Sequence, residues 1–338
     1  MKKFFQNIKF KNISLTTLAL ALVVSGFLVW GNTEAAITGI EVTSPNGGEV
    51  WSGSHDITWT TDPSGDVGTV NIYLVEGESS SSIATGEAND GSYSWDTTAH
   101  ADGSSYKIKI RATADSDVAD FSDSTFTIDN TAPTISISEP SLSLTKGGPI
   151  TYIVTYSGAS NVDLEVSDIT LNKTGDADGT VAVSGTGTET RTVTISDITG
   201  DGTLGITIGA DTAIDGASPA NSALGSGAST TFTVDKTAPT ATTVSIASSN
   251  TPNNLANVGD TVTLTIVTDE NVGKPTVTID ENAVAAENVV QGEDAQHWTA
   301  TRVMQAGDTE EALTFTIDFD DLAGNSATQI TAVTDGSS

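Results

Sequence analysis

The sequence predicts an all-β protein of three tandem β-sandwich domains that follow an N-terminal signal peptide. Three observations carry this prediction. Apolar and polar residues alternate with a period of two, clusters of Gly, Asp, Asn and Ser separate the alternating runs, and the phrase FTIDNTAPT at 126–134 returns as FTVDKTAPT at 232–240. A strand with one buried and one wet face is typical of antiparallel sheets, and evenly spaced short strands favour a sandwich.

The first 35 residues have the three parts of a secretory leader. A basic start is followed by an apolar run over about 15–30 and by Thr33-Glu34-Ala35, which has small residues at the −3 and −1 positions for cleavage before Ala36. The apolar run is short for a membrane span of about 20 residues, although an uncleaved anchor is the alternative. No later run has that length, so we expect a secreted, extracellular or cell-surface protein with no membrane span after the leader.

The strands of the mature chain are visible as alternating faces. Tyr106, Ile108 and Ile110 fall on one face of their segment, and Lys107 and Lys109 fall on the other. The same alternation runs through the segments 193–195, 262–266 and 313–319. Thr and Val fill many of these positions, and branching at Cβ suits a pleated strand. No sustained helical stripe accompanies them.

The repeated phrase is predicted to be a domain joint. Each copy begins as a strand that ends at Asp129 or Asp235, and Pro133 or Pro239 follows before a new strand starts. Proline has no N–H for a sheet ladder and restricts the residue before it. The phrase therefore closes one sandwich and stiffens the step to the next.

The joints divide the mature chain into domains at 36–130, 131–236 and 237–338. The third range has no closing FTVD phrase, so its sandwich is expected to lack its last strand. Either the sequence is a fragment of a longer array or another element caps the third sandwich. An uncovered edge strand would invite pairing with another chain.

Composition limits the partners. The chain carries 44 acidic and 13 basic residues, a formal net charge of −31. Such a charge repels nucleic acid and anionic membranes and attracts divalent cations, and solubility is the plainer explanation. The chain has no cysteine, which excludes disulfides and thiolate metal sites. Together with a secretory leader, this absence indicates a bacterial exported protein.

The second and third domains resemble bacterial Ig-like repeats. The resemblance rests on the joints DNTAPT and DKTAPT, on DDLAGNSA at 320–327 and on the looser DGASPANSA at 215–223, and it covers 131–338. Such repeats occur in long extracellular and surface proteins, which is the setting that the resemblance implies.

The first domain resembles another family, the fibronectin-like N-terminal domain of the yeast Kre/Knh cell-wall proteins. The matching stretches are ITGIEVTSPNGGEVWSGSHDITWT at 37–60, VNIYLVEG at 70–77, GSYSWD at 91–96 and YKIKIRAT at 106–113. This resemblance to a fibronectin type III-like module implies an extracellular setting and glycan contact. The yeast role in β-1,6-glucan assembly is not carried over, because a module does not fix a function.

Three tryptophans of the first domain are candidates for sugar contact. Trp51 and Trp95, if exposed, would stack on sugar rings as a glycan-binding site. Trp59 shares a strand face with Ile57, which favours the core. Packing in the core or at its rim is the alternative for Trp51 and Trp95 as well.

Catalytic motifs are missing from the sequence. His55, His100 and His297 form no H-E-x-x-H motif, and no G-x-S-x-G or phosphate-binding loop occurs. Carboxylates are too frequent to indicate glycosidase chemistry by pairing alone. We therefore expect no catalytic residues and no enzymatic activity.

Calcium is the only cofactor that the sequence suggests. Ca²⁺ takes hard oxygen ligands, and acidic turns supply them. Asp129, Asn130 and Asp235 of the joints are the candidate ligands, shared with loops such as DGTLG at 201–205 or DLAGN at 321–325. Capping of turns by Asp and Asn side chains is the alternative.

The most consistent function is a non-enzymatic, secreted or cell-surface spacer, adhesion or surface-presentation element. Its expected partner is an extracellular glycan or a cell-surface protein. The alternative is a carbohydrate-binding accessory region of a larger, truncated extracellular enzyme.

Overall fold

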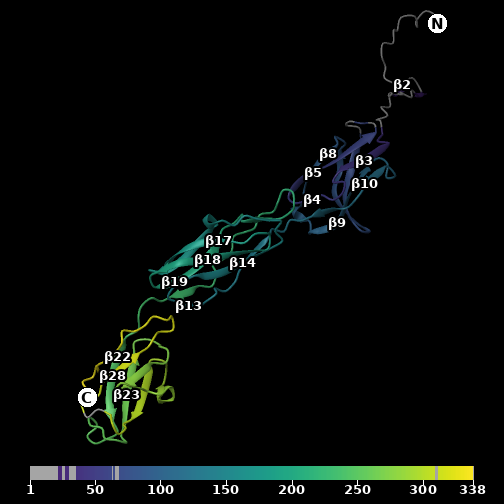
Figure 1. The fold of residues 1–338 in the computed structure, drawn as a ribbon. Helices are drawn as coiled ribbons and strands as arrows, with labels where there is room; N and C mark the ends of the chain where they lie inside the picture. The colour runs from purple at the N-terminus through teal and green to yellow at the C-terminus, as the bar shows by residue number, and fades with distance from the viewer. Residues whose placement is uncertain are drawn as a thin grey trace, which may run out of the picture. The chain divides into compact units, whose positions relative to one another are not determined.

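The computed structural model describes residues 22–24, 27–29, 36–62, 64, 68–308 and 311–337. In these residues the chain is built of strands with three short 3₁₀ helices, which confirms the all-β prediction (Figure 1). The helices are η1 (Thr97–Ala99), η2 (Val166–Asp168) and η3 (Ala286–Asn288). None of the helices in the described part of the chain has the length and apolar character of a membrane span.

The predicted signal peptide lies outside the described residues, apart from two short strands. These are β1 (Leu22–Val24) and β2 (Phe27–Val29), which pair antiparallel. The described residues fall into two compact units, one that ends at residue 132 and also holds 215–221, and one that holds 133–214 and 222–337.

The first unit contains one sandwich of two sheets. One sheet has the order β4-β11-β9-β6-β7 with β10 beside β9, and the other has the order β3-β5-β8. The strands are β3 (Gly39–Ser44), β4 (Val50–Trp51), β5 (Ser54–Asp62), β6 (Thr69–Glu76), β7 (Ser79–Ala88), β8 (Ser92–Asp96), β9 (Gly103–Ala112), β10 (Ala119–Phe121) and β11 (Phe126–Ile128). In β9 the predicted face of Tyr106, Ile108 and Ile110 is buried, as the alternation requires.

The second unit holds two separate cores, and the first of them is again a sandwich. Its sheets have the orders β12-β14-β18-β17 and β13-β21-β19-β16, with a small ladder of β15 and β20. The strands are β12 (Thr134–Ile137), β13 (Leu144–Thr145), β14 (Ile150–Ser157), β15 (Asn161–Val162), β16 (Ile169–Gly175), β17 (Asp178–Ser184), β18 (Thr190–Thr199), β19 (Gly202–Ile208), β20 (Ala213–Ile214) and β21 (Phe232–Val234). Tyr152 and Phe232 meet across its core.

The other core of this unit lies between sheets of the orders β22-β23-β27-β26 and β25-β24-β28. The strands are β22 (Ala241–Ser248), β23 (Thr261–Thr268), β24 (Thr276–Ile279), β25 (Asn282–Ala283), β26 (Val289–Gln291), β27 (His297–Val303) and β28 (Phe315–Asp318). Each of the three cores lies within one of the ranges 36–130, 131–236 and 237–338, whose boundaries stay a prediction.

The repeated phrase supplies the closing strand of the first two sandwiches. β11 pairs parallel with β4 and antiparallel with β9, and β21 pairs parallel with β13 and antiparallel with β19. In the third sandwich, no strand follows β28 within residues 319–337. That segment makes one bridge to β28, between Ile330 and Ile317. The missing last strand of the third domain stays a prediction.

Candidate functional site

The two copies of the repeated phrase fold with the same local turn. The side chain of Asp129 accepts the backbone N–H of Thr131 at 3.2 Å, and the side chain of Asp235 accepts that of Thr237 at 3.1 Å. An Asp that bonds to the backbone two residues ahead turns the chain out of its strand. The sequence alternative that these residues cap turns is therefore realised in both copies.

A second aspartate, from a distant loop, fastens each copy. Asp102 accepts the backbone N–H of Asn130 at 2.7 Å and the hydroxyl of Thr131. Asp201 does the same for the backbone N–H of Lys236, at 2.5 Å, and for the hydroxyl of the threonine that follows, at 3.1 Å. Hydrogen bonds to a carboxylate are the stronger kind, so each joint is held to the sandwich that it closes.

Glycine positions the aspartate that fastens the second copy. Asp201 lies between Gly200 and Gly202, which have φ values of +67° and +142°. A Cβ at either glycine would clash with a backbone oxygen, of Asp176 or Thr174 respectively. Glycine is therefore required on both sides of Asp201 for the hairpin to close.

An asparagine supplies the third contact. Asn221 Nδ2 donates to the backbone oxygen of Asp129 at 2.7 Å, and Asn325 Nδ2 donates to that of Asp235 at 2.8 Å. These asparagines belong to the stretches DGASPANSA and DDLAGNSA, whose sequence indicates only a resemblance to Ig-like repeats. Their contacts lie 92 and 90 residues away along the chain, so no local pattern reveals them.

A buried aspartate orients each asparagine. Asp215 accepts the backbone N–H of Asn221 at 2.9 Å and its Nδ2 at 2.6 Å. Asp321 accepts both groups of Asn325 at 2.7 Å. Both aspartates are 5% exposed. Buried carboxylates need such partners, and the partners in turn hold the amide in one orientation.

The second joint also gathers three carboxylates. Asp235, Glu270 and Asp321 each place one oxygen within 4.8 Å of the others. Burial raises the pKa of Glu270, and the charges of Asp235, Asp321 and Asp269 raise it further. Like charges held this close favour a bound cation, and carboxylate oxygens are the ligands that Ca²⁺ prefers.

The first joint differs at one position of this group. Thr134 and Thr240 are equivalent residues of the two copies. Thr134 pairs with Ser157, and Thr240 bonds to Asp269, so Ser157 and Asp269 are equivalent as well. The next residue is Gly158 in one case and Glu270 in the other, so the carboxylate of Glu270 has no counterpart at the first joint. Among the described residues, no group of three close carboxylate or imidazole side chains includes Asp129. From the sequence alone, the two joints are equally good candidates for calcium binding.

The side-chain amide of Asn130, another candidate calcium ligand, is hydrogen-bonded within its own sandwich. Its Oδ1 accepts the N–H of Gly53 and the hydroxyl of Thr97, both at 3.1 Å, and its Nδ2 donates to the oxygen of Thr97 at 3.0 Å. The amide is thus occupied at both ends. It fastens the closing strand to its own sandwich.

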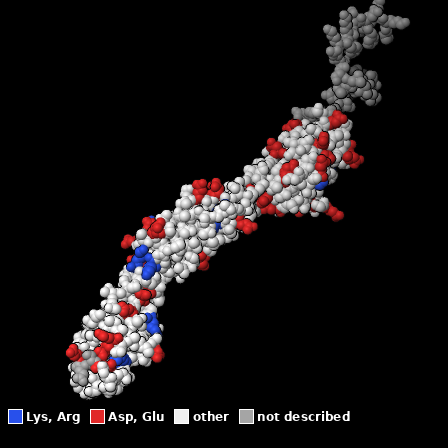
Figure 2. Space-filling view, viewed as in Figure 1, with Lys and Arg blue, Asp and Glu red and all other residues white. Residues whose placement is uncertain are grey.

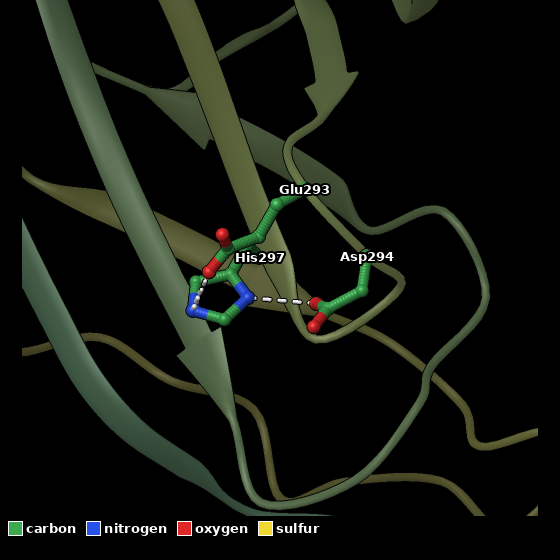
Figure 3. A group of neighbouring side chains, drawn as sticks. All are labelled: Glu293, Asp294 and His297. Atoms are coloured by element: carbon green, nitrogen blue, oxygen red, sulfur yellow. Dashed lines mark hydrogen bonds and ion pairs between the residues drawn. The ribbon is translucent and has the colours of Figure 1, made fainter.

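A third cluster, Glu293, Asp294 and His297, lies at the start of β27 (Figure 3). His297 Nδ1 is 2.7 Å from Asp294 Oδ1, and Nε2 is 3.5 Å from Glu293 Oε1. The hydrogen bond to Asp294 raises the pKa of His297, and the same bond lowers the pKa of Asp294. Metal ligation needs a neutral ring nitrogen. With a carboxylate at each nitrogen, the arrangement is that of an imidazolium ion pair.

The tryptophans of the first sandwich are packed inside. Trp51 and Trp95 are each 5% exposed. Trp51 stacks on His55, with ring centroids 4.5 Å apart, and Trp95 meets the ring of His100 edge-on. This burial speaks against sugar stacking on Trp51 and Trp95 and fits the packing alternative.

Trp59 lies in the core, as its strand face predicted. Its ring is 3% exposed, and its indole N–H donates to Asn89 at 2.8 Å. The partner satisfies the polar group that burial removes from water.

Solved structures similar to this chain include strings of Ig domains. The titin I67–I69 E-to-A variant has 10% identity and a TM-score of 0.38, and it covers 88% of this chain and 98% of its own. The titin I9–I11 tandem has 11% identity and a TM-score of 0.29, with coverages of 86% and 97%. Eight N-terminal Ig domains of the Down syndrome cell adhesion molecule have 12% identity and a TM-score of 0.25, with coverages of 87% and 47%. The likeness concerns the fold alone.

A sequence comparison with curated proteins finds no match. Residues 44–128, in contrast, match the family described as the Kre9/KNH-like N-terminal Ig-like domain. The match falls on the first sandwich and leaves the rest of the chain uncovered. The first sandwich is therefore similar to the Kre9/KNH-like N-terminal Ig-like domain, and two further β-sandwiches follow it.

Proposed function

We propose that the protein is a non-enzymatic, extracellular spacer or adhesion element of a bacterial surface, which presents a binding element on a series of β-sandwiches. The observation that carries the proposal is the joint network. In both copies, a turn-forming aspartate, a loop aspartate and an asparagine hold the repeated phrase. A chain whose joints are built twice to one design is suited to a mechanical or spacing task.

Domain types support the same proposal. The matched family and the similar structures are non-catalytic Ig-like domains, and the Kre9/KNH family is related to the cell wall. The surface is consistent with an exposed location, because acidic side chains are scattered over the visible face of each unit with few basic ones between them (Figure 2). Such a surface stays soluble and avoids nucleic acid.

The joint network predicts well-defined joints, and distance measurements between spin labels test this. The chain has no cysteine, so introduced cysteines are labelled alone. Exposed Ser80, Ser184 and Gln291 provide one label in each sandwich. We expect a narrow distance distribution for Ser184→Cys with Gln291→Cys, and a broader one when Asn325→Ala is added.

The pair Ser80→Cys with Ser184→Cys serves as the matched control. Asn325→Ala should leave its distribution unchanged, and Asn221→Ala should broaden it. Broad distributions for both pairs in the parent chain would contradict a spacing function, because the joints would then be flexible linkers.

We also propose that calcium binds at the second joint, through Asp235, Glu270 and Asp321. The support is the proximity of three carboxylates in a partly buried site, where a divalent cation would relieve their repulsion. Calcium would connect the closing strand to the loop 321–325 in addition to the Asn325 contact. A chelator should then lower the melting temperature of the chain, and Glu270→Gln should remove that dependence.

A further inference from the structure

The basic residues of the first sandwich lie together on one strand. The range 36–130 contains 16 acidic residues, and its only basic residues are Lys107, Lys109 and Arg111. All three belong to β9, where they occupy every second position. Ile108 and Ile110 between them are buried, so the three cations lie on the outer face of the sheet. A strongly acidic sandwich thus has one local cationic face.

Aromatic rings flank the central cation of this face. Phe121 of β10 and Tyr73 of β6 are the residues opposite Lys109 on its two neighbouring strands. Lys109 Nζ lies 4.9 Å from the ring centre of Phe121, and the guanidinium carbon of Arg111 lies 5.5 Å from that of Tyr73. Phe121 is 42% exposed, so its ring is accessible to a ligand. Rings and cations therefore share one face of three adjacent strands.

The positive charges of this face are not compensated by carboxylates. Among the residues that the structure describes, no ion pair involves Lys107, Lys109 or Arg111. Lys107 Nζ donates to the backbone oxygen of Asp123 at 2.9 Å, and Arg111 Nη2 donates to Tyr73 Oη at 3.0 Å. Arg111 Nε is buried and has no acceptor in the described part of the chain. An anion bound to the guanidinium would stabilise this under-satisfied group.

The neighbouring strand β7 extends the face with hydroxyl groups. Ser82 is opposite Tyr73, and Ser80 is opposite Val75, the partner of Lys107. Both serines are exposed. The face therefore combines cations, aromatic rings and hydroxyls. A polysaccharide that carries carboxylates uses all three, because its carboxylates pair with Lys and Arg, its hydroxyls form hydrogen bonds, and the C–H groups of its rings pack on aromatic side chains.

We propose that this face, formed by Lys107, Lys109, Arg111, Tyr73 and Phe121, binds a carboxylate-bearing polysaccharide. Charge complementarity favours an anionic ligand over a neutral glycan, which would leave the three cations uncompensated. The net charge of −31 opposes nucleic acid more strongly than a carboxylated polysaccharide, because phosphates are spaced more densely along their chain. The face is separate from the joints, so failure of this binding would leave the spacing function in place.

Titration of the full chain with an oligogalacturonide, followed by calorimetry in a buffer with EDTA, tests the proposal. The chelator removes any calcium bridge between the carboxylates of the ligand and those of the protein. We expect saturable binding that weakens as the salt concentration rises, because the contacts are charged. The same oligomer with its carboxylates reduced to alcohols is the matched control, and it should bind at least about tenfold more weakly.

Protein variants locate the binding. Lys107→Gln with Lys109→Gln removes two charges from the face and should lower the affinity at least about tenfold, whereas Lys107→Arg with Lys109→Arg should retain it. Lys173→Gln is the matched control, because it removes a cation whose side chain is 45% exposed in the second sandwich, and the affinity should stay unchanged. Phe121→Ala keeps all three cations and should still lower the affinity severalfold, since the ring contact is lost. Thermal melting checks that each variant is folded.

Several results would overturn the proposal. The oligogalacturonide does not bind the parent chain, or it binds no more tightly than its reduced form. Lys173→Gln loses as much affinity as the variant with both glutamines, which would mean attraction to any basic residue. Phe121→Ala binds as tightly as the parent chain, which would leave a surface that only exchanges ions. A single-stranded DNA of similar length binds more tightly than the oligogalacturonide and depends on Lys107 and Lys109, which would assign the face to nucleic acid.

Discussion

Replacing Asn325 by alanine tests the joint network most directly. Asn325 Nδ2 makes two hydrogen bonds, to the backbone oxygen of Asp235 at 2.8 Å and to the carboxylate of Asp321 at 2.7 Å. The alanine variant loses both and keeps the bond from the backbone N–H of residue 325 to Asp321. Since Asp321 is 5% exposed, water does not readily replace the lost partner.

The size of the effect follows from the two bonds. A bond between neutral groups contributes about 0.5–1.5 kcal/mol to stability, and one to a charged group contributes about 1.5–3 kcal/mol. The carboxylate of Asp321 also loses one hydrogen-bond donor while it stays close to the carboxylates of Asp235 and Glu270. We therefore expect Asn325→Ala to lower the free energy of unfolding of the third sandwich by about 2–4 kcal/mol.

Urea unfolding monitored by tryptophan fluorescence measures this loss. Trp298 is the one tryptophan of residues 131–338 and is packed in the third core, so the difference between the chain and its Trp298→Phe variant reports on that sandwich. The midpoint of the Trp298 transition should fall. Asn221→Ala, which alters the equivalent contact of the first joint, should leave that midpoint in place.

A loss below about 0.5 kcal/mol would refute the reasoning, because it would mean that the two bonds contribute no more than a surface contact. An equal loss in Asn221→Ala would refute it as well, since the effect would then not be local to the second joint.

Four further predictions follow from the site and the core. Calcium should raise the melting temperature of the chain and of Asp129→Asn but not of Glu270→Gln, and a rise in the last variant would exclude Glu270 as a ligand. The raised pKa of Glu270 means that its charge costs stability once the pH exceeds the pKa of the unfolded state, so Glu270→Gln should stabilise the calcium-free chain at pH 7 and have little effect at pH 4. The raised pKa of His297 works in the opposite direction. Its ion pair stabilises the fold fully below the pKa of the unfolded state, and this contribution is lost as the pH rises through the pKa of the folded state. His297→Gln should therefore flatten the dependence of the melting temperature on pH between about pH 6 and 8. A glycan array probed with the full chain should give no signal that Trp51→Ala removes, since that ring has no open face; such a signal would restore the sugar-stacking hypothesis.

The strands and the turn in each copy of the repeated phrase could be predicted because their signals are local. Side chains on a strand alternate between faces, so the burial of Phe315 and Ile317 follows from spacing alone. The phrase around Asp129 and Asp235 contains its own proline and turn residues. Trp51, by contrast, lies in a two-residue strand, where no alternating run shows which way the ring faces.

The rest of the network could not be predicted because it depends on contacts between distant parts of the chain. Asp102 reaches the first joint from 28 residues away, and Asp201 reaches the second from 35. Glu270, which separates the second joint from the first as a calcium candidate, belongs to a loop that no motif marks. Only the folded chain brings these residues together.

The origin of the contacts to residues 129–131 has a consequence for the exchange of modules, by recombination or by protein engineering. Asp102, earlier in the chain, bonds to Asn130, and Asn221, in the later segment 215–221, bonds to Asp129. A crossover placed at Pro133 would take Asp129 from one parent and the loop with Asn221 from the other. Chimeras should therefore form this joint only when the second parent carries a loop equivalent to that of Asp215 and Asn221. The repeated phrase and this distant loop should be exchanged together.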